Sequence, residues 1–354
     1  PPRNRRIQTP TTPPIMKSQI YLRHQHRFRR KVQGRFSSMQ GRITMEKPFL
    51  SIDQQIDLLR SRGMTIDDSK TAKQTLETIS YYRLSGYYYP FRQYDDITQT
   101  RSDIFSPNTK LEQVLALYKF DERLRATTFQ ELSRIEVGLR ALIGYTLGEE
   151  HPHLHLASSR LGPSGFDKEN KHETKKYRKW IYSYEKSRKR SQEDFIRHYR
   201  DEYNGKLPVW VAVHILEWGK LALLFKMAPF HCQDTIATSL HLTRSQVNSW
   251  LENLRILRNI CAHQGRLFNR TLRKVKLPND AETLGITQLS PKRNKCFDQL
   301  TLIQYLIRTM GLGDGTALPA VLATFPATDV VPLRATGTPD NWQSLPLWSC
   351  EPTT

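Results

Sequence analysis

Cysteine is scarce in this chain, and long apolar runs and alternating strand patterns are missing. The 354 residues include four Cys, with no C-x-x-C spacing and no His-rich cluster, so neither a disulfide framework nor a zinc site is indicated. The most apolar stretch, residues 209–225, is interrupted by three polar side chains and is no candidate for the ~18 consecutive apolar residues of a membrane span. We therefore expect a cytoplasmic protein with reduced thiols, no cofactor, no metal and no membrane partner.

Acidic residues are absent from the first 45 positions, which hold 11 of the Lys and Arg residues. Of the formal net charge of +20, this leaves +9 for the rest of the chain. Segments that combine high net charge with few periodic apolar positions do not form a core. Residues 1–46 are therefore expected to be a disordered basic extension. A nucleic-acid-binding arm and a spurious extension upstream of the true start are both open interpretations.

The remaining sequence shows helical periodicity and no alternation of period two bounded by hairpin turns. We predict an all-α fold, with residues 47–310 as one helical domain and residues 311–354 as a Pro-rich tail docked by Trp342 and Trp348. Capping boxes are indicated at Ser51 with Gln54, at Thr109 with Glu112 and at Thr243 with Gln246. Helices are expected at residues 52–62, 68–84, 109–148 with at most one break, 170–187, 191–203, 208–228, 244–264 and 297–310.

A helix over residues 244–264 carries the pattern R-N-x-x-x-H, formed by Arg258, Asn259 and His263. Arginine is always charged, and histidine titrates near neutral pH, so the pair supplies a cation for phosphate and a proton carrier. Cleavage of RNA without a metal needs both of these groups. Gly265 suits the left-handed residue that ends a helix. The alternative interpretation is an Arg and a His that cap the last turn of the helix.

Several further segments, taken with the motif, resemble the Abi-like abortive-infection (AbiD/AbiF-type) family of bacterial phage-defence proteins. They are residues 79–92, 117–125, 134–140, 208–210, 217–220 and 254–270, with 337–342 and 346–348 near the C-terminus. The resemblance covers residues 47–310 and 336–349, and its blocks occur in the family's order. Through the R-N-x-x-x-H motif, the family is placed among the HEPN ribonucleases, α-helical enzymes that include many toxins.

The resemblance implies a HEPN-like helical bundle with an additional N-terminal helical region and an irregular C-terminal tail. It also implies a metal-independent endoribonuclease toxin that leaves 2′,3′-cyclic phosphate ends. His263 would move protons, Arg258 would stabilise the charge on phosphorus, and Asn259 would orient the phosphate or His263. One chain supplies one motif, so a homodimer is implied. In HEPN relatives an acidic residue on a neighbouring helix steadies the motif Arg; Glu136, spaced for an ion pair with Arg140, is the candidate here.

Basic residues outside the motif are candidates for RNA contact. Arg255, Arg266 and Arg270 lie close to it in sequence. Residues 168–190 alternate cations with aromatic side chains, and the candidates there are Lys175, Lys176, Arg178, Lys179 and Trp180. Cations neutralise phosphate, and aromatic rings stack on unpaired bases. The alternative is a solvated helix face whose aromatic rings pack inward. The tyrosine-rich run at residues 81–91 has two interpretations, stacking on RNA bases and packing against the core, and we expect the second.

Two functions other than the nuclease stay open from the sequence. In the first, the protein is a non-catalytic module that binds RNA or another partner, and Arg258 and His263 only grip phosphate. In the second, it is a toxin relative held silent by an antitoxin, which could be a small RNA. Cyclic-phosphate ends on cleaved RNA would distinguish the nuclease from both.

Overall fold

The computed structural model describes residues 48–349, so the prediction for residues 1–46 falls outside the described part of the chain. The fold is mostly α-helical, as predicted, with twelve α-helices and two small two-stranded sheets among the described residues. None of the described helices combines the length and the apolar composition that crossing a membrane requires.

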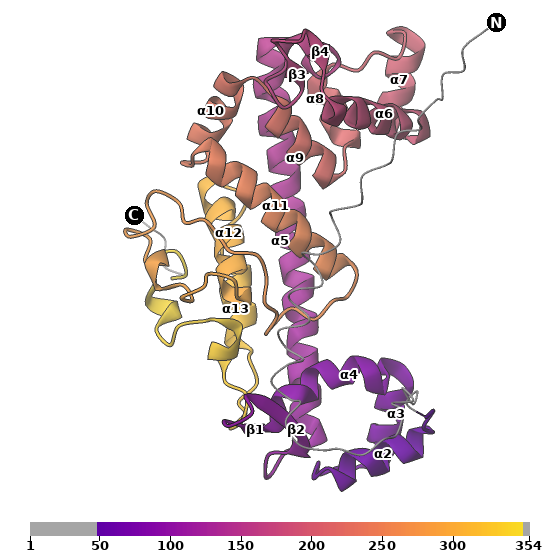
Figure 1. Cartoon of the computed structure of the whole chain (residues 1–354), viewed down its shortest axis with the longest axis vertical. Coiled ribbons are helices and arrows are strands. Elements are labelled where there is room, and N and C mark those ends of the chain that lie inside the picture. Colours follow the sequence, from indigo (N-terminus) through magenta and orange to yellow (C-terminus); the bar gives the residue numbers. More distant parts are fainter. Residues whose placement is uncertain (1–47, 350–354) are drawn as a thin grey trace, which may run out of the picture. The chain divides into compact units, whose positions relative to one another are not determined.

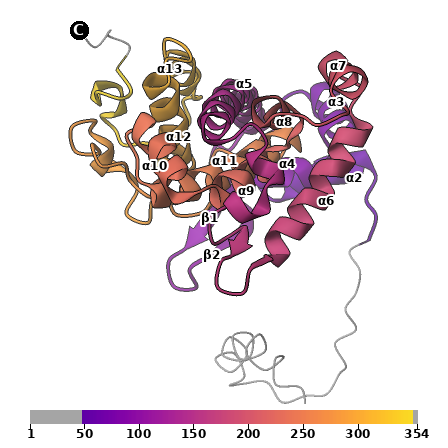
Figure 2. The same cartoon turned by 90° about the horizontal axis from the view of Figure 1, so that it is seen from above.

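The helix α5 (Leu111–Glu150) is 40 residues long and organises the core. Buried apolar side chains, such as Leu117, Leu124 and Ile135, recur along it at helical spacing. The helix is continuous, so the one break that the sequence left open does not occur. The helices that pack most extensively against it are α4 (Tyr81–Tyr88), α8 (Val209–Ala212), α10 (Phe230–Ser239), α11 (Arg244–Ala262), α12 (Cys296–Thr309) and α13 (Ala317–Ala323) (Figure 1). Viewed from above, α13 lies on one side of α5 and α8 on another (Figure 2).

The N-terminal helices α2 (Ile52–Ser61), α3 (Ser69–Ile79) and α4 precede a hairpin of β1 (Arg92–Asp95) and β2 (Thr100–Phe105). The capping box predicted at Ser51 is present. The single helix predicted over residues 68–84 is wrong, because Ser80 adopts φ +65° and divides α3 from α4. Ser80 then caps α4 by accepting from the backbone N–H of Arg83.

The start of α5 also differs from the prediction. Thr109 donates its hydroxyl to the carbonyl oxygen of Ser106 instead of capping the helix. The N-cap residue of α5 is Lys110, and its backbone N–H donates to the side-chain oxygen of Gln113 at 2.9 Å. The capping pair therefore lies one position later than predicted, at Lys110 and Gln113 instead of Thr109 and Glu112.

The middle of the chain contains β3 (Phe166–Asp167), β4 (His172–Glu173), α6 (Lys175–Arg190) and α7 (Asp194–Glu202). The helix predicted over residues 208–228 is divided into α8, the short 3-10 helix η4 (Val213–Ile215) and α9 (Trp218–Met227). The chain is extended at Leu216 and Glu217, so α9 starts in a new direction. The helix α10 was not predicted.

At the C-terminal end, α12 matches the helix predicted at residues 297–310 to within one residue at each end. Trp342 and Trp348 are both buried, and the ring of Trp348 stacks on Phe297 with centroids 4.5 Å apart. The tail also forms α13, which the prediction of an irregular segment did not include.

A buried histidine beneath α6 makes the stability of the fold depend on pH. His155 is fully buried, with rings of Trp180 and Tyr184 against it and its Nδ1 unpaired within residues 48–349. Burial and, to a smaller extent, the charge of His153 lower the pKa of His155 from 6.5 to about 3. The unfolded chain therefore binds a proton below about pH 6.5 that the folded chain does not bind, and stability falls as the pH drops towards 3.

We expect His155→Phe to reduce this pH dependence. Between pH 7 and pH 5 the loss of unfolding free energy should be about 2 kcal/mol smaller in the variant than in the wild type. Denaturant unfolding at both pH values measures the difference, and comparing slopes removes any constant effect of the substitution. Equal pH dependence in both proteins would show that His155 takes up its proton in the folded state as readily as in the unfolded state, which would contradict the lowered pKa.

Candidate active site

The motif helix α11 forms where the sequence predicts it. Thr243 and Gln246 make the expected capping box, with each side chain accepting the other residue's backbone N–H. Trp250, Leu254 and Leu257 are buried on one face, and the Trp250 indole donates to the carbonyl oxygen of Lys276 at 2.8 Å. This apolar stripe holds α11 against α5 and leaves the polar motif face outside the core.

The end of α11 is closed by its backbone. The N–H of Gly265 donates to the Ile260 carbonyl at 2.8 Å, and that of Gln264 to Cys261 at 3.1 Å, which is the Schellman arrangement. The prediction that Gly265 is the left-handed residue is wrong, since Gln264 has φ +57°. Gly265 is instead a close-approach position, because a Cβ there would lie 3.1 Å from the Ile260 side chain.

The side chains of Arg258, Asn259 and His263 are all available for contact. His263 is exposed, and Arg258 and Asn259 are half-buried. The Arg258 guanidinium lies 5.7 Å from the ring centroid of Phe129 on α5. None of the three side chains makes a hydrogen bond or an ion pair within residues 48–349. They do not bind the last carbonyls of the helix, so the capping interpretation does not describe this geometry.

The loop after α11 brings a further cation to the motif. Arg270 is exposed, and its guanidinium lies 3.3 Å from the position that a Cβ on Gly265 would take. Arg266 is used differently: it is half-buried and donates to the carbonyl oxygen of Gly86 on α4. Burial lowers the pKa of Arg266. Within residues 48–349 the Arg270 guanidinium makes no hydrogen bond or ion pair, so of these two predicted RNA contacts Arg270 is the one available beside the motif.

A buried ionic network fixes the segment that follows the motif. Asp121 and Arg125 of α5 form an ion pair with side chains 0% and 2% exposed. Asp121 also accepts from the Tyr87 hydroxyl at 2.7 Å and from the backbone N–H groups of Leu267 and Phe268 at 3.1 and 2.8 Å. Arg125 donates to the Tyr87 hydroxyl at 3.0 Å. Sequence reasoning missed this network, although Asp121 and Arg125 have the spacing of a helical ion pair.

The thiol inside the motif is chemically quiet. Cys261 is buried, and burial, together with the charge of Asp121, raises the pKa of its thiol to about 12. A thiol with that pKa stays protonated near neutral pH and is a poor nucleophile. The reactive groups that the motif offers to solvent are therefore the side chains of Arg258, Asn259 and His263.

The other predicted residues near the motif are engaged with one another. Arg255 donates to Glu252 at 2.6 and 3.0 Å, and Glu252 also pairs with Arg273 at 3.3 Å, so the charge of Arg255 is offset. These contacts lower the pKa of Glu252, with the hydrogen bond from Arg255 as the largest cause. Arg255 thus has less charge available for phosphate than Arg258 or Arg270.

The predicted contact between Glu136 and the motif Arg is not present in the described residues. Glu136 forms the expected ion pair with Arg140 on the next turn of α5. Arg140 also donates to the carbonyl oxygen of Leu216 at 2.9 Å, which ties the pair to the turn before α9. Phe129, rather than Glu136, is the α5 residue that lies against Arg258.

The basic helix α6 packs against α9, and α9 packs against α11. Lys175, Lys176, Arg178 and Lys179 are exposed, as RNA contact requires. Trp180 corrects the prediction, because it is 2% exposed and its indole donates to the carbonyl oxygen of Lys220 at 2.9 Å. Its ring is stacked against that of Tyr184 and is not open to a base.

The structure brings together three metal-ligand side chains that are apart in sequence. The ligand atoms of Glu150, His231 and Cys232 lie within 4.8 Å of one another, and His231 Nε2 is 2.9 Å from Glu150. Oxygen, nitrogen and sulfur ligands of this kind suit zinc. Glu150 is separated from Phe129 by about 31 Å along α5, at about 1.5 Å per residue, so this group is remote from the motif.

Comparison with known proteins bears on the same part of the chain. The sequence model of a family described as "Abi-like protein" matches residues 74–269, which is more than half of the chain. This range includes the Asp121 network, the basic helix α6 and the motif helix α11. No curated protein and no solved structure matches the chain.

Proposed function

The chain belongs to the Abi-like protein family, whose name associates it with abortive infection, and we propose that it is a phage-defence toxin that cleaves RNA without a metal. The proposal rests on the unpaired side chains of the motif. Arg258 and His263 lie at one end of α11, and their side chains make no polar contact within residues 48–349. A cation and a proton carrier are both left free for a ligand. Arg270 adds a second cation beside them, and it too has no polar partner in the described part of the chain.

The proposed reaction is an internal transfer at phosphorus. The RNA 2′-hydroxyl attacks the adjacent phosphorus, the new 2′-oxygen–phosphorus bond forms, and the bond to the 5′-oxygen breaks. One proton leaves the 2′-hydroxyl, and another reaches the departing 5′-oxygen; His263 carries protons in these steps. Arg258 stabilises the negative charge that develops on the phosphorane. Asn259 orients the phosphate or His263. The products are a 2′,3′-cyclic phosphate and a 5′-hydroxyl.

We expect RNA cleavage by the purified protein to continue at an unchanged rate in EDTA, because the reaction draws its proton carrier and its cation from side chains. The measurement is the rate of loss of a defined RNA with and without the chelator, beside a metal-dependent nuclease as a control. Removal of a metal from Glu150, His231 and Cys232 should leave the rate unchanged, since that group is remote from the motif. Activity that disappears in EDTA and returns with added Mg²⁺ or Zn²⁺ would contradict the mechanism.

We also propose that two copies form the working unit. One Arg258 and one His263 offer few groups to hold both sides of a scissile phosphate, and a twofold axis would double them. Phe129, which lies beneath Arg258, is 37% exposed, so apolar surface is available next to the motif for a second copy.

Mixing two inactive variants tests the shared site. Arg258→Ala and His263→Ala proteins, combined under conditions of subunit exchange, should recover activity above either protein alone. Light scattering should give about twice the 41.4 kDa chain mass. A monomer with full activity at nanomolar concentration would rule out the dimer as the working unit.

Non-catalytic RNA binding remains the second candidate function. The exposed cations Lys175, Lys176, Arg178 and Lys179 support an RNA ligand whether or not the motif is catalytic. A toxin relative held silent by an antitoxin or a small RNA would share the same surfaces. Cleavage assays on the isolated protein separate these possibilities.

A further inference from the structure

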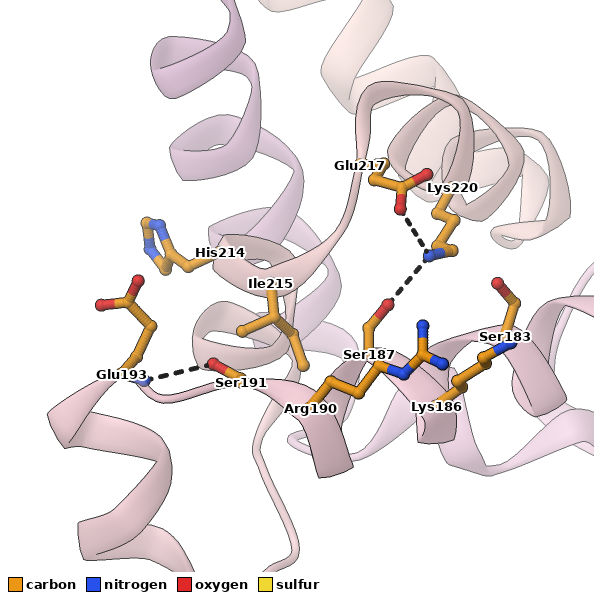
Figure 3. Close-up of a pocket in the computed structure, with 10 residues that line it drawn as sticks. All are labelled: Ser183, Lys186, Ser187, Arg190, Ser191, Glu193, His214, Ile215, Glu217 and Lys220. Atoms are coloured by element: carbon orange, nitrogen blue, oxygen red, sulfur yellow. Dashed lines mark hydrogen bonds and ion pairs between the residues drawn. The ribbon is translucent and has the colours of Figure 1, made fainter.

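We propose that a pocket of about 510 Å³ beside α6 binds one nucleotide of an unpaired RNA strand, with its phosphate against Lys186, Arg190 and Lys220. The pocket lies between the C-terminal half of α6, the link to α7, η4 and the start of α9 (Figure 3). The inference takes the class of its ligand from the proposed ribonuclease function. It adds a binding site that contains none of the motif residues.

The size and lining of the pocket fit a polar ligand. Its volume lies within the range of about 300–1,000 Å³ that is usual for small-molecule sites. Nine of its ten lining residues are polar, and Ile215 is the exception. An apolar ligand or a peptide helix would leave these polar groups without partners.

Two of the three cations are free to bind an anion. Lys186 and Arg190 are exposed and make no hydrogen bond or ion pair within residues 48–349. Lys220 donates to Ser187 at 2.9 Å and to Glu217 at 3.3 Å, as Figure 3 shows. A lysine ammonium has three donors, so one donor of Lys220 is still available. Phosphate oxygens accept hydrogen bonds from all three cations.

The other side of the pocket supplies acceptors. Figure 3 shows Glu193 and His214 together, away from Lys186 and Arg190. Burial and the charge of Arg140 lower the pKa of His214, which favours its neutral ring. A nucleotide has ribose hydroxyls and base amino groups that can donate to such acceptors, besides its anionic phosphate. Inorganic phosphate would use only the cationic side, so a nucleotide matches the pocket better.

An exposed tyrosine beside the pocket indicates an unpaired strand. Tyr182 is 74% exposed, in contrast to the buried Trp180 and Tyr184 of the same helix. It lies one turn from Lys186 on one side and one turn from Arg178 on the other, so cations flank it along α6. Aromatic rings stack on bases that are not paired, whereas a duplex keeps its base faces covered. Tyr182 would stack the base next to the nucleotide in the pocket.

The test is the binding of a short unpaired RNA oligonucleotide, labelled for fluorescence anisotropy and carrying 2′-deoxy residues that prevent cleavage. The variants are Lys186→Gln with Arg190→Gln, and Tyr182→Ala. The matched control, Lys70→Gln with Lys73→Gln on α3, removes the same charge from exposed residues outside the pocket. The pocket variant should weaken binding roughly tenfold and reduce the log–log salt slope by about 0.7, for the one lost phosphate contact. Tyr182→Ala should weaken binding roughly tenfold.

Affinity and salt slope in the pocket variant equal to those of the control would overturn the proposal. The proposal would also be overturned if the pocket variant lost the binding of AMP but kept its affinity for the oligonucleotide. The occupant of the pocket would then be a free nucleotide. RNA duplex binding as tight as that of the unpaired strand, and equally dependent on Tyr182, would also contradict it. Pocket-dependent binding in a protein that does not cleave RNA would support the pocket and contradict the nuclease. RNA cleavage by a protein whose RNA binding does not depend on the pocket would support the nuclease and contradict the pocket.

Discussion

His263→Ala is expected to lower the rate of RNA cleavage by roughly 10²–10⁴-fold, the usual contribution of an acid–base group. The side chain is exposed and has no polar partner within residues 48–349, so its removal should leave the thermal unfolding of the protein unchanged. His172→Ala, at another exposed histidine, is the matched control and should keep wild-type activity. Full cleavage activity in His263→Ala would exclude His263 as the proton carrier.

Arg258→Ala should reduce cleavage by a similar factor, because the developing phosphorane charge would lose its cation. Its contact with the Phe129 ring contributes only about 0.5–1 kcal/mol to stability, so the variant should still fold. Arg258→Lys keeps the charge but loses the planar, forked donor, and should recover part of the rate. Equal activity in the alanine and lysine variants would indicate that the charge of Arg258 does not act in the reaction.

Asp121→Ala is expected to lower the free energy of unfolding by about 3–5 kcal/mol, the typical cost of breaking a buried ion pair. The substitution leaves the guanidinium of Arg125 buried without its counter-ion, and the N–H groups of Leu267 and Phe268 lose their acceptor. Denaturant unfolding measures the change.

Two further variants separate the effect of the buried charge from the effects of an exposed charge and of hydrogen bonding. Glu122→Ala, at the exposed neighbouring position, should change stability by only about 0.5 kcal/mol or less. Asp121→Asn keeps an acceptor but removes the charge, and should fall between the two. An Asp121→Ala protein as stable as Glu122→Ala would mean that the network does not hold the loop after the motif.

Helices were predictable where the local sequence contains both a capping residue and apolar residues at helical spacing. Ser51 with Gln54 and Thr243 with Gln246 mark the starts of α2 and α11, and both capping boxes are present. The divisions of the chain at Ser80 and Glu217 were not predictable, because apolar residues continue across them. The positive φ of Ser80 is a backbone state that this residue type rarely adopts, so composition gives no sign of it.

The motif and its position at a helix end were predictable from the sequence, but its surroundings were not. The Asp121 network joins residues 34 and 146 positions apart, and only the fold determines that they meet. The burial of Trp180 has the same origin, since α9 covers the face of α6 that carries it. Tyr182, Lys186 and Arg190 belong to the basic stretch that the sequence singles out. Their place at a pocket depends on Lys220, which comes from another helix.

We propose that Arg258 and His263 cleave RNA by attack of the 2′-hydroxyl on phosphorus, and the ends of the product identify that reaction. The most direct measurement is the chemistry of the ends produced when the purified protein acts on total RNA. We expect 2′,3′-cyclic phosphate and 5′-hydroxyl ends that are absent with His263→Ala protein. Ends that carry a 3′-hydroxyl and a 5′-phosphate, or RNA that stays intact, would contradict the proposal.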